Sequence, residues 1–316
     1  MKKDLSIIIP LFNEEESLPE LCSWIARVMK NMNLEYEIIF VDDGSSDNSW
    51  KVIQSLWEQY PVVRGFRFGR NYGKSAALDL GFQHASGNVV ITMDADLQDS
   101  PDEIPKLYDF IANKGYHLVS GWKQKRFDPI SKTLPSKLFN RVTSWFSGIR
   151  LHDFNCGLKA YQGKVVKTIH LYGEMHRYIP MIAKQNGFGR ITETVVEHRA
   201  RKYGVTKFGL ERFIYGFLDL LSISFVSKFR KRPMHFFGSL GTLSFLLGFG
   251  ITLYLIWEKL YNLRNHLRVR DVVDQPIFFL ALVAIVVGVQ LFLAGFLGEI
   301  LANQNKKEDY IITEEL

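Results

Sequence analysis

Cysteine is scarce in this chain of 316 residues, which contains only Cys22 and Cys156. Two cysteines are too few for a disulfide framework, and their spacing matches neither a zinc site nor a C-x-x-C redox motif. This usage fits a reduced, cytoplasmic compartment. A secretory signal is not expected either, because the first apolar run, from Leu5 to Phe12, is short and is interrupted by Pro10.

Charged side chains are absent from two long stretches in the last third of the chain. Residues 234–257 and 276–298 contain no Asp, Glu, Lys or Arg, whereas residues 1–205 mix charged and apolar residues evenly. Each stretch exceeds the roughly 20 residues that cross a bilayer core. The sequence therefore predicts a soluble domain, a transmembrane hairpin over residues 233–301 and a cytoplasmic tail over 302–316, in a multi-pass protein of the cytoplasmic (inner) membrane.

A strong excess of one charge is also missing, since the net charge is only +6. That value, without a basic stripe bearing stacking aromatics, indicates no nucleic acid partner. Positive charge gathers instead at residues 228–232, directly before the first apolar stretch, where it would meet anionic lipid headgroups. A solvated charge run is the alternative. The loop at 258–275 is basic too, so charge alone orients the hairpin only weakly.

Short apolar runs alternate with helical patterns over the first 125 residues. This alternation predicts an α/β fold with a mostly parallel sheet covered by helices. Polar clusters follow the first, second and fourth apolar runs, so acidic groups should converge at one edge of the sheet. The expected strands are 5–9, 36–41, 62–68, 88–93 and 117–120, and the expected helices lie near 17–32, 47–59, 74–85 and 102–114.

Residues 206–232 lead from this domain into the first apolar stretch. Leu210, Phe213, Ile214 and Phe217 recur there at helical spacing, with polar residues on the other face. Such a stripe is typical of a soluble core helix. Because it runs into the basic cluster and an apolar span, we favour amphipathic helices lying in the bilayer interface.

Asp94 and Asp96 end the fourth apolar run. Their i, i+2 spacing on an extended chain directs both carboxylates to one side. Together with Gln98 they offer hard oxygen ligands, which suit Mg²⁺ or Mn²⁺ beside a substrate phosphate. The alternative is that these carboxylates cap the helix that begins near Pro101.

Two other loops carry residues that could contact a nucleotide. Asp42 or Asp43 at the end of the second run could accept hydrogen bonds from a nucleobase or ribose. The Gly73-Lys74-Ser75 sequence looks like a phosphate loop, but Phe68 stands where that motif requires glycine, which argues against a nucleoside triphosphatase. Backbone amides at the following helix start, with Arg70, could still support a nucleotide.

Cationic side chains concentrate again shortly before the predicted membrane region. Arg binds phosphate oxygens through a planar fork and Lys as a point charge. Arg199, Arg201 and Lys207 could therefore hold an anionic lipid head or a diphosphate. Nonspecific attraction to lipid is the alternative.

Five motifs, taken in order, resemble those of the family-two glycosyltransferases and, within them, the polyprenyl-phosphate glycosyltransferases. The resemblance covers residues 4 to about 210 by motif, and the rest by its interfacial stretch and two spans. The motifs are Ile9-Pro10-Leu11-Phe12-Asn13-Glu14-Glu15, Val41-Asp42-Asp43-Gly44-Ser45-Ser46-Asp47, Arg70-Asn71-Tyr72-Gly73-Lys74, Met93-Asp94-Ala95-Asp96-Leu97-Gln98-Asp99-Ser100-Pro101 and Asp153-Phe154-Asn155-Cys156-Gly157-Leu158-Lys159.

This resemblance implies a GT-A nucleotide-sugar-binding domain at residues 1–205 and a divalent ion. The implied reaction transfers one sugar, glucose or a related hexose, from a UDP-linked donor to polyprenyl (undecaprenyl) phosphate with inversion. By position, Pro10, Asn13, Glu14 and Asp42 would bind the nucleoside; Asp94, Asp96 and Gln98 would hold the metal and diphosphate; Arg141, Arg199, Arg201 and Lys207 would face phosphates; and Asp96 and Asp153 would have catalytic roles.

Some positions depart from the family pattern. Trp122-Lys123 and Leu158-Lys159 stand where relatives often have Ser-Arg and Phe-Arg, which leaves the acceptor contacts there open. A processive polysaccharide synthase is the main rival, although such enzymes have more spans. A noncatalytic membrane assembly factor is a second rival, and a homo-oligomer is left open.

Overall fold

The computed structural model describes residues 3–124, 140–145, 147–199, 202–203, 233–268 and 270–304. The chain divides into two compact units, Met1–Ser222 and Ile223–Leu316, which are taken in turn below. The boundary predicted after residue 205, the expected interfacial helices at 206–232 and the tail beyond residue 304 lie outside the described residues.

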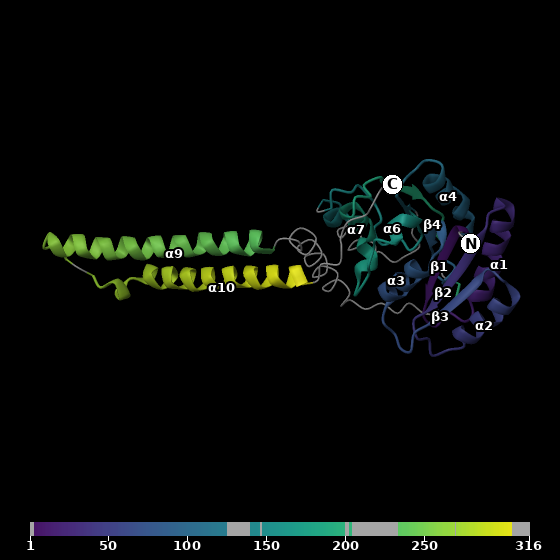
Figure 1. Cartoon of the computed structure of the whole chain (residues 1–316), viewed down its shortest axis with the longest axis horizontal. Coiled ribbons are helices and arrows are strands. Elements are labelled where there is room, and N and C mark those ends of the chain that lie inside the picture. The colour runs from purple at the N-terminus through teal and green to yellow at the C-terminus, as the bar shows by residue number, and fades with distance from the viewer. Residues whose placement is uncertain are drawn as a thin grey trace. The chain divides into compact units, whose positions relative to one another are not determined.

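The first unit is built on a seven-stranded sheet in the order β3-β2-β1-β4-β6-β5-β7 (Figure 1). Among the described strands, β6 alone runs antiparallel to its neighbours β4 and β5. The predicted α/β class with a mostly parallel sheet is therefore confirmed. The strands are β1 Lys3–Leu11, β2 Tyr36–Asp42, β3 Val63–Arg67, β4 Gly87–Thr92, β5 Leu118–Trp122, β6 Lys159–Gln162 and β7 Ile191–Val195.

Helices cover both faces of this sheet, which explains why the central strands are continuous apolar runs. In β1, Ile7 and Ile9 face a core shared with α1, α2 and α4, while Ile8 faces a second core shared with α3, α6 and α7. The helical segments are α1 Leu18–Met32, α2 Ser49–Gln59, α3 Lys74–His84, η1 Pro101–Glu103, α4 Ile104–Ala112, α6 Gly163–Val166, η2 Met175–Tyr178 and α7 Ile179–Gln185.

A buried polar network joins three strands at the edge of the sheet where β1 and β2 begin. Glu37 of β2 accepts hydrogen bonds from Ser6 Oγ at 2.6 Å, Ser86 N at 2.7 Å and Arg64 Nη1 at 2.9 Å. Burial opposes the charge on Glu37, but these donors outweigh it and lower the pKa of the carboxyl below its ordinary value. Glu37 thus fastens β1, β2, β3 and the entry to β4 together.

The second unit contains two long apolar helices, α9 (Pro233–Arg264) and α10 (Pro276–Gln304), with the short η3 (Val272–Asp274) between them. The most apolar 18-residue stretches within residues 233–264 and 276–301 have mean hydropathies of 1.8 and 2.8, and most side chains of the two helices are exposed. Both helices are long and apolar enough to cross a membrane. They contain the two predicted spans.

Small residues bring α9 and α10 together side by side (Figure 1). A Cβ atom at Gly248 would stand 2.5 Å from the Ala281 carbonyl oxygen, and one at Gly288 would stand 2.6 Å from the Phe245 nitrogen. Ser244 Oγ also donates a hydrogen bond to the Ala284 carbonyl at 2.8 Å. The helices therefore pack backbone to backbone, as is common for membrane helices.

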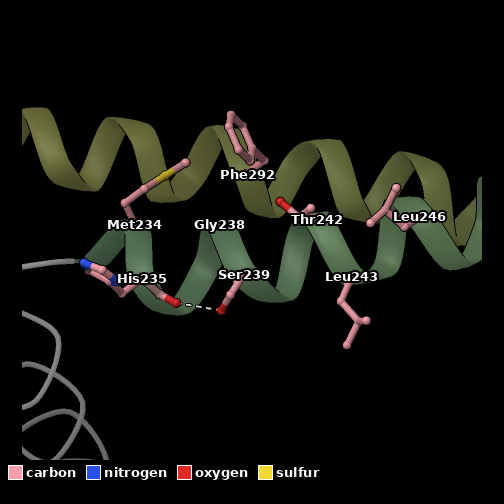
Figure 2. A pocket seen from close by; sticks show the side chains of 8 residues that line it. All are labelled: Met234, His235, Gly238, Ser239, Thr242, Leu243, Leu246 and Phe292. Atoms are coloured by element: carbon pink, nitrogen blue, oxygen red, sulfur yellow. Dashed lines mark hydrogen bonds between the residues drawn. The ribbon is translucent and has the colours of Figure 1, made fainter.

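A shallow hollow of about 540 Å³ lies near the start of α9. Figure 2 shows that residues of the first turns of α9 line it, with Phe292 of α10 behind them. Ser239 Oγ there donates to the His235 carbonyl at 2.6 Å, so its hydroxyl is satisfied within its own helix. Among the described residues that line it, the others are apolar or small and uncharged, and His235 is the one with a basic side chain.

Candidate functional site

Three loops meet where β1, β2 and β4 end. Strand register sets this meeting, because Leu11 of β1 lies opposite Asp42 of β2 and Ile8 lies opposite Thr92 of β4. The ends of these strands and the segments that follow them carry Asn13, the Asp42-Asp43 pair and Asp94. The expected convergence of polar groups at one edge is therefore observed.

The first two loops are fastened to each other. Asn13 has a left-handed backbone, with φ of 55°, and its Oδ1 accepts a hydrogen bond from Ser46 N at 2.8 Å. Its own N–H donates to Ser45 Oγ at 2.8 Å, and Glu14 N donates to Ser49 Oγ at 2.9 Å. Asn13 thus holds the loop after β1 against the loop after β2, a structural role that its sequence position alone did not indicate.

The two aspartates at the end of β2 have different surroundings. Asp42 is fully buried; its Oδ1 accepts from Ser45 N at 2.8 Å, and Arg67 Nε lies 3.4 Å from its Oδ2. Asp43 accepts from the backbone N–H groups of Tyr72 at 2.7 Å and Gly73 at 2.9 Å. Burial raises the pKa of Asp43 in spite of these donors. Asp43 therefore anchors the loop that leads into α3.

Asp94 lies among lysines. Its carboxylate forms an ion pair with Lys74 at the start of α3. Burial works to raise the pKa of Asp94, but the positive charges of Lys74, Lys123 and Lys159 outweigh it and hold the pKa far below the ordinary range. Asp94 is therefore a carboxylate in electropositive surroundings.

Asp96 and Gln98 continue the same loop, which turns sharply at Leu97, with φ of 60°. Asp96 is 8% exposed, and its Oδ1 accepts a hydrogen bond from Gln98 N at 3.2 Å. The Gln98 backbone carbonyl in turn accepts a hydrogen bond from Arg199 N at 3.0 Å. The loop therefore draws the 198–199 segment to the acidic pair.

The Asp153 loop is supported by residues from two other segments. Ser120 Oγ of β5 donates to the Asp153 carbonyl at 3.1 Å. Asn140 Nδ2 donates to the His152 carbonyl at 2.8 Å, and Asn140 Oδ1 accepts from Phe154 N at 3.3 Å. Asp153 itself is 1% exposed, and its Oδ1 accepts from Asn155 N at 3.1 Å. Asn140 had no sequence signal except its place beside Arg141.

Residues 6–170 match the family described as Glycosyl transferase family 2. The chain belongs to glycosyl transferase family 2.

Named relatives of this family 2 glycosyltransferase share most of its length. It is 35% identical to a dodecaprenyl-phosphate galacturonate synthase of Rhizobium johnstonii over 97% of this chain and 90% of the relative. It is 36% identical to an undecaprenyl-phosphate 4-deoxy-4-formamido-L-arabinose transferase of Shewanella sediminis over 93% of this chain and 86% of the relative. The expected resemblance to polyprenyl-phosphate glycosyltransferases is thus confirmed.

Solved structures confirm the fold of the glycosyltransferase domain. A glucosyl-3-phosphoglycerate synthase from Mycobacterium tuberculosis, in complex with Mn²⁺, UDP-glucose and phosphoglyceric acid, superposes with a TM-score of 0.55 at 16% identity. The likeness covers 71% of this chain and 79% of that one. The same enzyme in complex with UDP gives a TM-score of 0.55 at 17% identity, covering 71% of this chain and 80% of that one. The predicted GT-A fold is therefore observed.

The protein oxygens at this site can hold a divalent ion only if water and a bound diphosphate complete its coordination. In the part of the chain that the structure describes, no group of three or more His, Cys, Asp or Glu side chains is placed to hold a metal. Asp94 and Asp96 supply hard oxygens, and Asp94 already forms an ion pair with the ammonium of Lys74. Two carboxylates completed by water and a diphosphate are what Mg²⁺ and Mn²⁺ commonly accept.

The predicted phosphate-binding cations are less closely gathered than the acidic residues at the sheet edge. Arg199 pairs with Glu197 at 3.1 Å and stacks over the Trp24 ring, 4.5 Å from its centroid. Arg70 lies over Tyr72 in the same manner, at 4.7 Å. Arg141 is exposed on the helical segment 140–145, and Arg201 and Lys207 lie outside the described residues.

Buried lysines are the main feature that sequence reasoning missed. Lys159 of β6 is almost fully buried and donates to the Cys156 carbonyl; burial lowers its pKa. Lys123 lies 2.7 Å from the buried Asp99, whose charge outweighs burial and raises the lysine pKa. The departures at Lys123 and Lys159 from the family pattern were the available signal. Burial raises the pKa of Cys156 to about 12, so its thiol is not a nucleophile at neutral pH.

The turn η2 also reaches this region. His176 N donates to Ser75 Oγ at 3.0 Å, and His176 Nδ1 lies 3.0 Å from the same oxygen. Ser75 follows Lys74, so η2 is fixed beside the first turn of α3. Arg177 is buried and pairs with Glu174 at 2.8 Å, which indicates a structural role for it.

Proposed function

We propose that the chain transfers a single sugar from a nucleotide diphosphate sugar to polyprenyl phosphate, with inversion, at the cytoplasmic face of the membrane. The observation that carries this proposal is the acidic loop of Asp94 and Asp96 at the sheet edge of a family 2 domain that is followed by two apolar helices. The acceptor is proposed from the names of the relatives, which contain dodecaprenyl phosphate and undecaprenyl phosphate.

The donor side is assigned to the loops after β1, β2 and β4. Pro10, Asn13, Glu14 and Asp42 would contact the nucleoside, with Arg70 nearby. Asp94, Asp96 and Gln98 would hold Mg²⁺ or Mn²⁺ and the diphosphate. When bound, such an ion offsets the charge that develops on the departing nucleoside diphosphate. The Lys74 ammonium, already beside Asp94, adds positive charge at the same place.

The acceptor side needs orientation more than base catalysis. A phosphomonoester has a second pKa near ~6, so the lipid phosphate is largely ionised at neutral pH. Asp153 would act by orienting the nucleophile or by stabilising positive charge at the anomeric carbon. Arg141, Arg199, Arg201 and Lys207 are proposed phosphate contacts, since guanidinium and ammonium groups pair with phosphate oxygens.

The cytoplasmic orientation rests on the donor. Nucleotide sugars are cytosolic, and a hairpin returns both of its flanks to one side of the bilayer. The hairpin of α9 and α10 meets that requirement, because the two helices pack antiparallel through small residues. We propose the multi-pass topology and the unit boundaries on this basis.

The identity of the transferred sugar is the most specific part of the proposal. Glucose or a related hexose on UDP is the expectation from the sequence, whereas the named relatives point to galacturonate or 4-deoxy-4-formamido-L-arabinose. The test is a panel of these UDP-sugars, offered with undecaprenyl phosphate and Mg²⁺ or Mn²⁺ to the full-length protein in detergent. We expect one donor to be preferred, one sugar on each lipid, and loss of transfer with EDTA.

The same assay separates the rival functions. A ladder of products with several sugars would indicate a processive synthase, and no transfer from any donor would indicate a noncatalytic assembly factor. The presence of two candidate spans among the described residues favours single transfer, because two helices do not by themselves enclose a polymer path. Gel filtration of the same preparation determines whether the protein is a homo-oligomer.

A further inference from the structure

Gly157 lies directly against the carboxylate of Asp94. A Cβ atom at Gly157 would stand 2.5 Å from both Cγ and Oδ1 of Asp94 and would overlap Oδ2. These distances are far inside van der Waals contact. A side chain at residue 157 and the observed position of the Asp94 carboxylate therefore exclude each other.

The backbone at Gly157 has little freedom to move away. Thr92 Oγ1 of β4 donates a hydrogen bond to the Gly157 carbonyl at 2.8 Å. Gly121 N of β5 donates to the Leu158 carbonyl at 2.9 Å, and Lys159 then enters β6 opposite Thr92. Because the loop is bonded to strands on both sides, an added methyl group would displace the Asp94 carboxylate rather than the loop.

Backbone conformation does not explain a glycine here. Gly157 has no positive φ, so an alanine could adopt its backbone without strain. What glycine provides at this position is the close approach of a backbone to an acidic side chain.

We propose that Gly157 is a positioning residue, whose missing side chain lets the Asp153 loop seat the Asp94 carboxylate for the metal and the donor diphosphate. This rests on the proposed function. Through Gly157, the loop that carries the acceptor-side carboxylate also determines the geometry of the donor side.

The test compares Gly157→Ala with wild-type full-length protein in detergent. Mn²⁺ binding in the presence of UDP is measured from the EPR signal of free Mn²⁺, and the melting temperature is measured without metal. We expect the affinity for Mn²⁺ to fall about 10-fold to 100-fold, as when other supports of metal ligands are altered. Gly189→Ala is the matched control, because a Cβ there meets nothing within 4 Å, and it should leave the Mn²⁺ affinity unchanged.

A double-mutant cycle with Asp94→Ala asks whether Gly157 acts through that carboxylate. If it does, Gly157→Ala should add no further loss of Mn²⁺ affinity in the Asp94→Ala background, and its effect on the melting temperature should shrink there. Wild-type affinity in Gly157→Ala, or additive effects in the cycle, would overturn the inference. If the wild type itself binds no Mn²⁺, the proposed metal role fails, and the melting-temperature cycle still decides whether Gly157 positions Asp94.

Discussion

The Lys74 ammonium forms an ion pair with Asp94, the carboxylate that the sequence predicts to bind a metal. The pair is half-buried, and Lys123 and Lys159 add to the positive surroundings of Asp94. A buried carboxylate without such partners would tend to be neutral. The lysines therefore keep Asp94 ionised, which is the form that can bind a cation or face a phosphate-bound ion.

Replacing Asp96 with Asn tests the metal role at the scale of one residue. The change is nearly isosteric but removes an anionic oxygen ligand, so we expect it to reduce metal-dependent transfer to less than a tenth of wild type. A tenth corresponds to about 1.4 kcal/mol in the barrier. The measurement is the transfer rate to undecaprenyl phosphate, with binding to membranes as the control for folding. A variant that retains more activity would remove Asp96 from the metal site.

Individual residues were predictable where the signal was local. Asp94, Asp96 and Gln98 could be singled out because an i, i+2 pair at a strand end has a defined direction. Gly157 and Lys74 could not be given their roles in this way, because their contacts with Asp94 depend on how distant segments meet. No local pattern encodes such a meeting.

At the scale of elements, the lowered pKa of Glu37 predicts that the stability of the sheet depends on pH. Its pKa is lowered in the folded protein, so its contribution to stability is present above the ordinary value of 4.5 and is lost as pH falls through the lower folded value. We expect Glu37→Gln to cost about 1.5–3 kcal/mol at neutral pH, since hydrogen bonds to a charged group are broken.

Thermal unfolding of full-length protein in detergent measures this effect. The gap in melting temperature between wild type and Glu37→Gln should be widest near neutral pH and should narrow below about pH 4.5. A gap of constant size across this range would show that the charge of Glu37 is not what joins the strands.

The packing of α9 on α10 can be tested by a bulky residue at the contact. Gly248→Leu should push the helices apart, because even a Cβ there would stand 2.5 Å from the Ala281 carbonyl oxygen. Gly250→Leu is the matched control, since a Cβ at Gly250 meets nothing within 4 Å. The measurement is disulfide cross-linking between cysteines placed at residues 244 and 284. Equal cross-linking in the two variants would contradict this packing.

Elements were predictable where their periodicity was strong. The five expected strands and the helices between them lie within a few residues of the observed ones, because buried parallel strands and amphipathic helices leave clear patterns. β6 and β7 were not among the predicted strands. They are short, and their place in the sheet is fixed by pairing with β4 and β5 rather than by a pattern of their own.

At the scale of the whole molecule, membrane attachment should not depend on the hairpin alone. A fragment of residues 1–232 keeps the amphipathic stretch and the basic cluster at 228–232. We expect it to bind vesicles of anionic lipid more tightly than neutral ones, because each exposed basic residue contributes about 1 kcal/mol. The binding should weaken with salt.

Vesicle sedimentation measures this binding. The matched control is the same fragment with its basic residues at 228–232 replaced by Gln, which should lose the preference for anionic lipid. Equal partitioning of the unaltered fragment into both kinds of vesicle would contradict the electrostatic part of the prediction.

The place of β6 in the sheet determines an order of assembly during translation. β1 to β4 are neighbours in space and are complete once residue 92 has left the ribosome, whereas β5, among the described strands, bonds to the later strands β6 and β7. A nascent chain that ends before β6 therefore carries the donor-side loops but leaves one edge of β4 unpaired. Unpaired strand edges associate with other chains. The free edge of β4 is therefore open to wrong pairing until β6 has been synthesised.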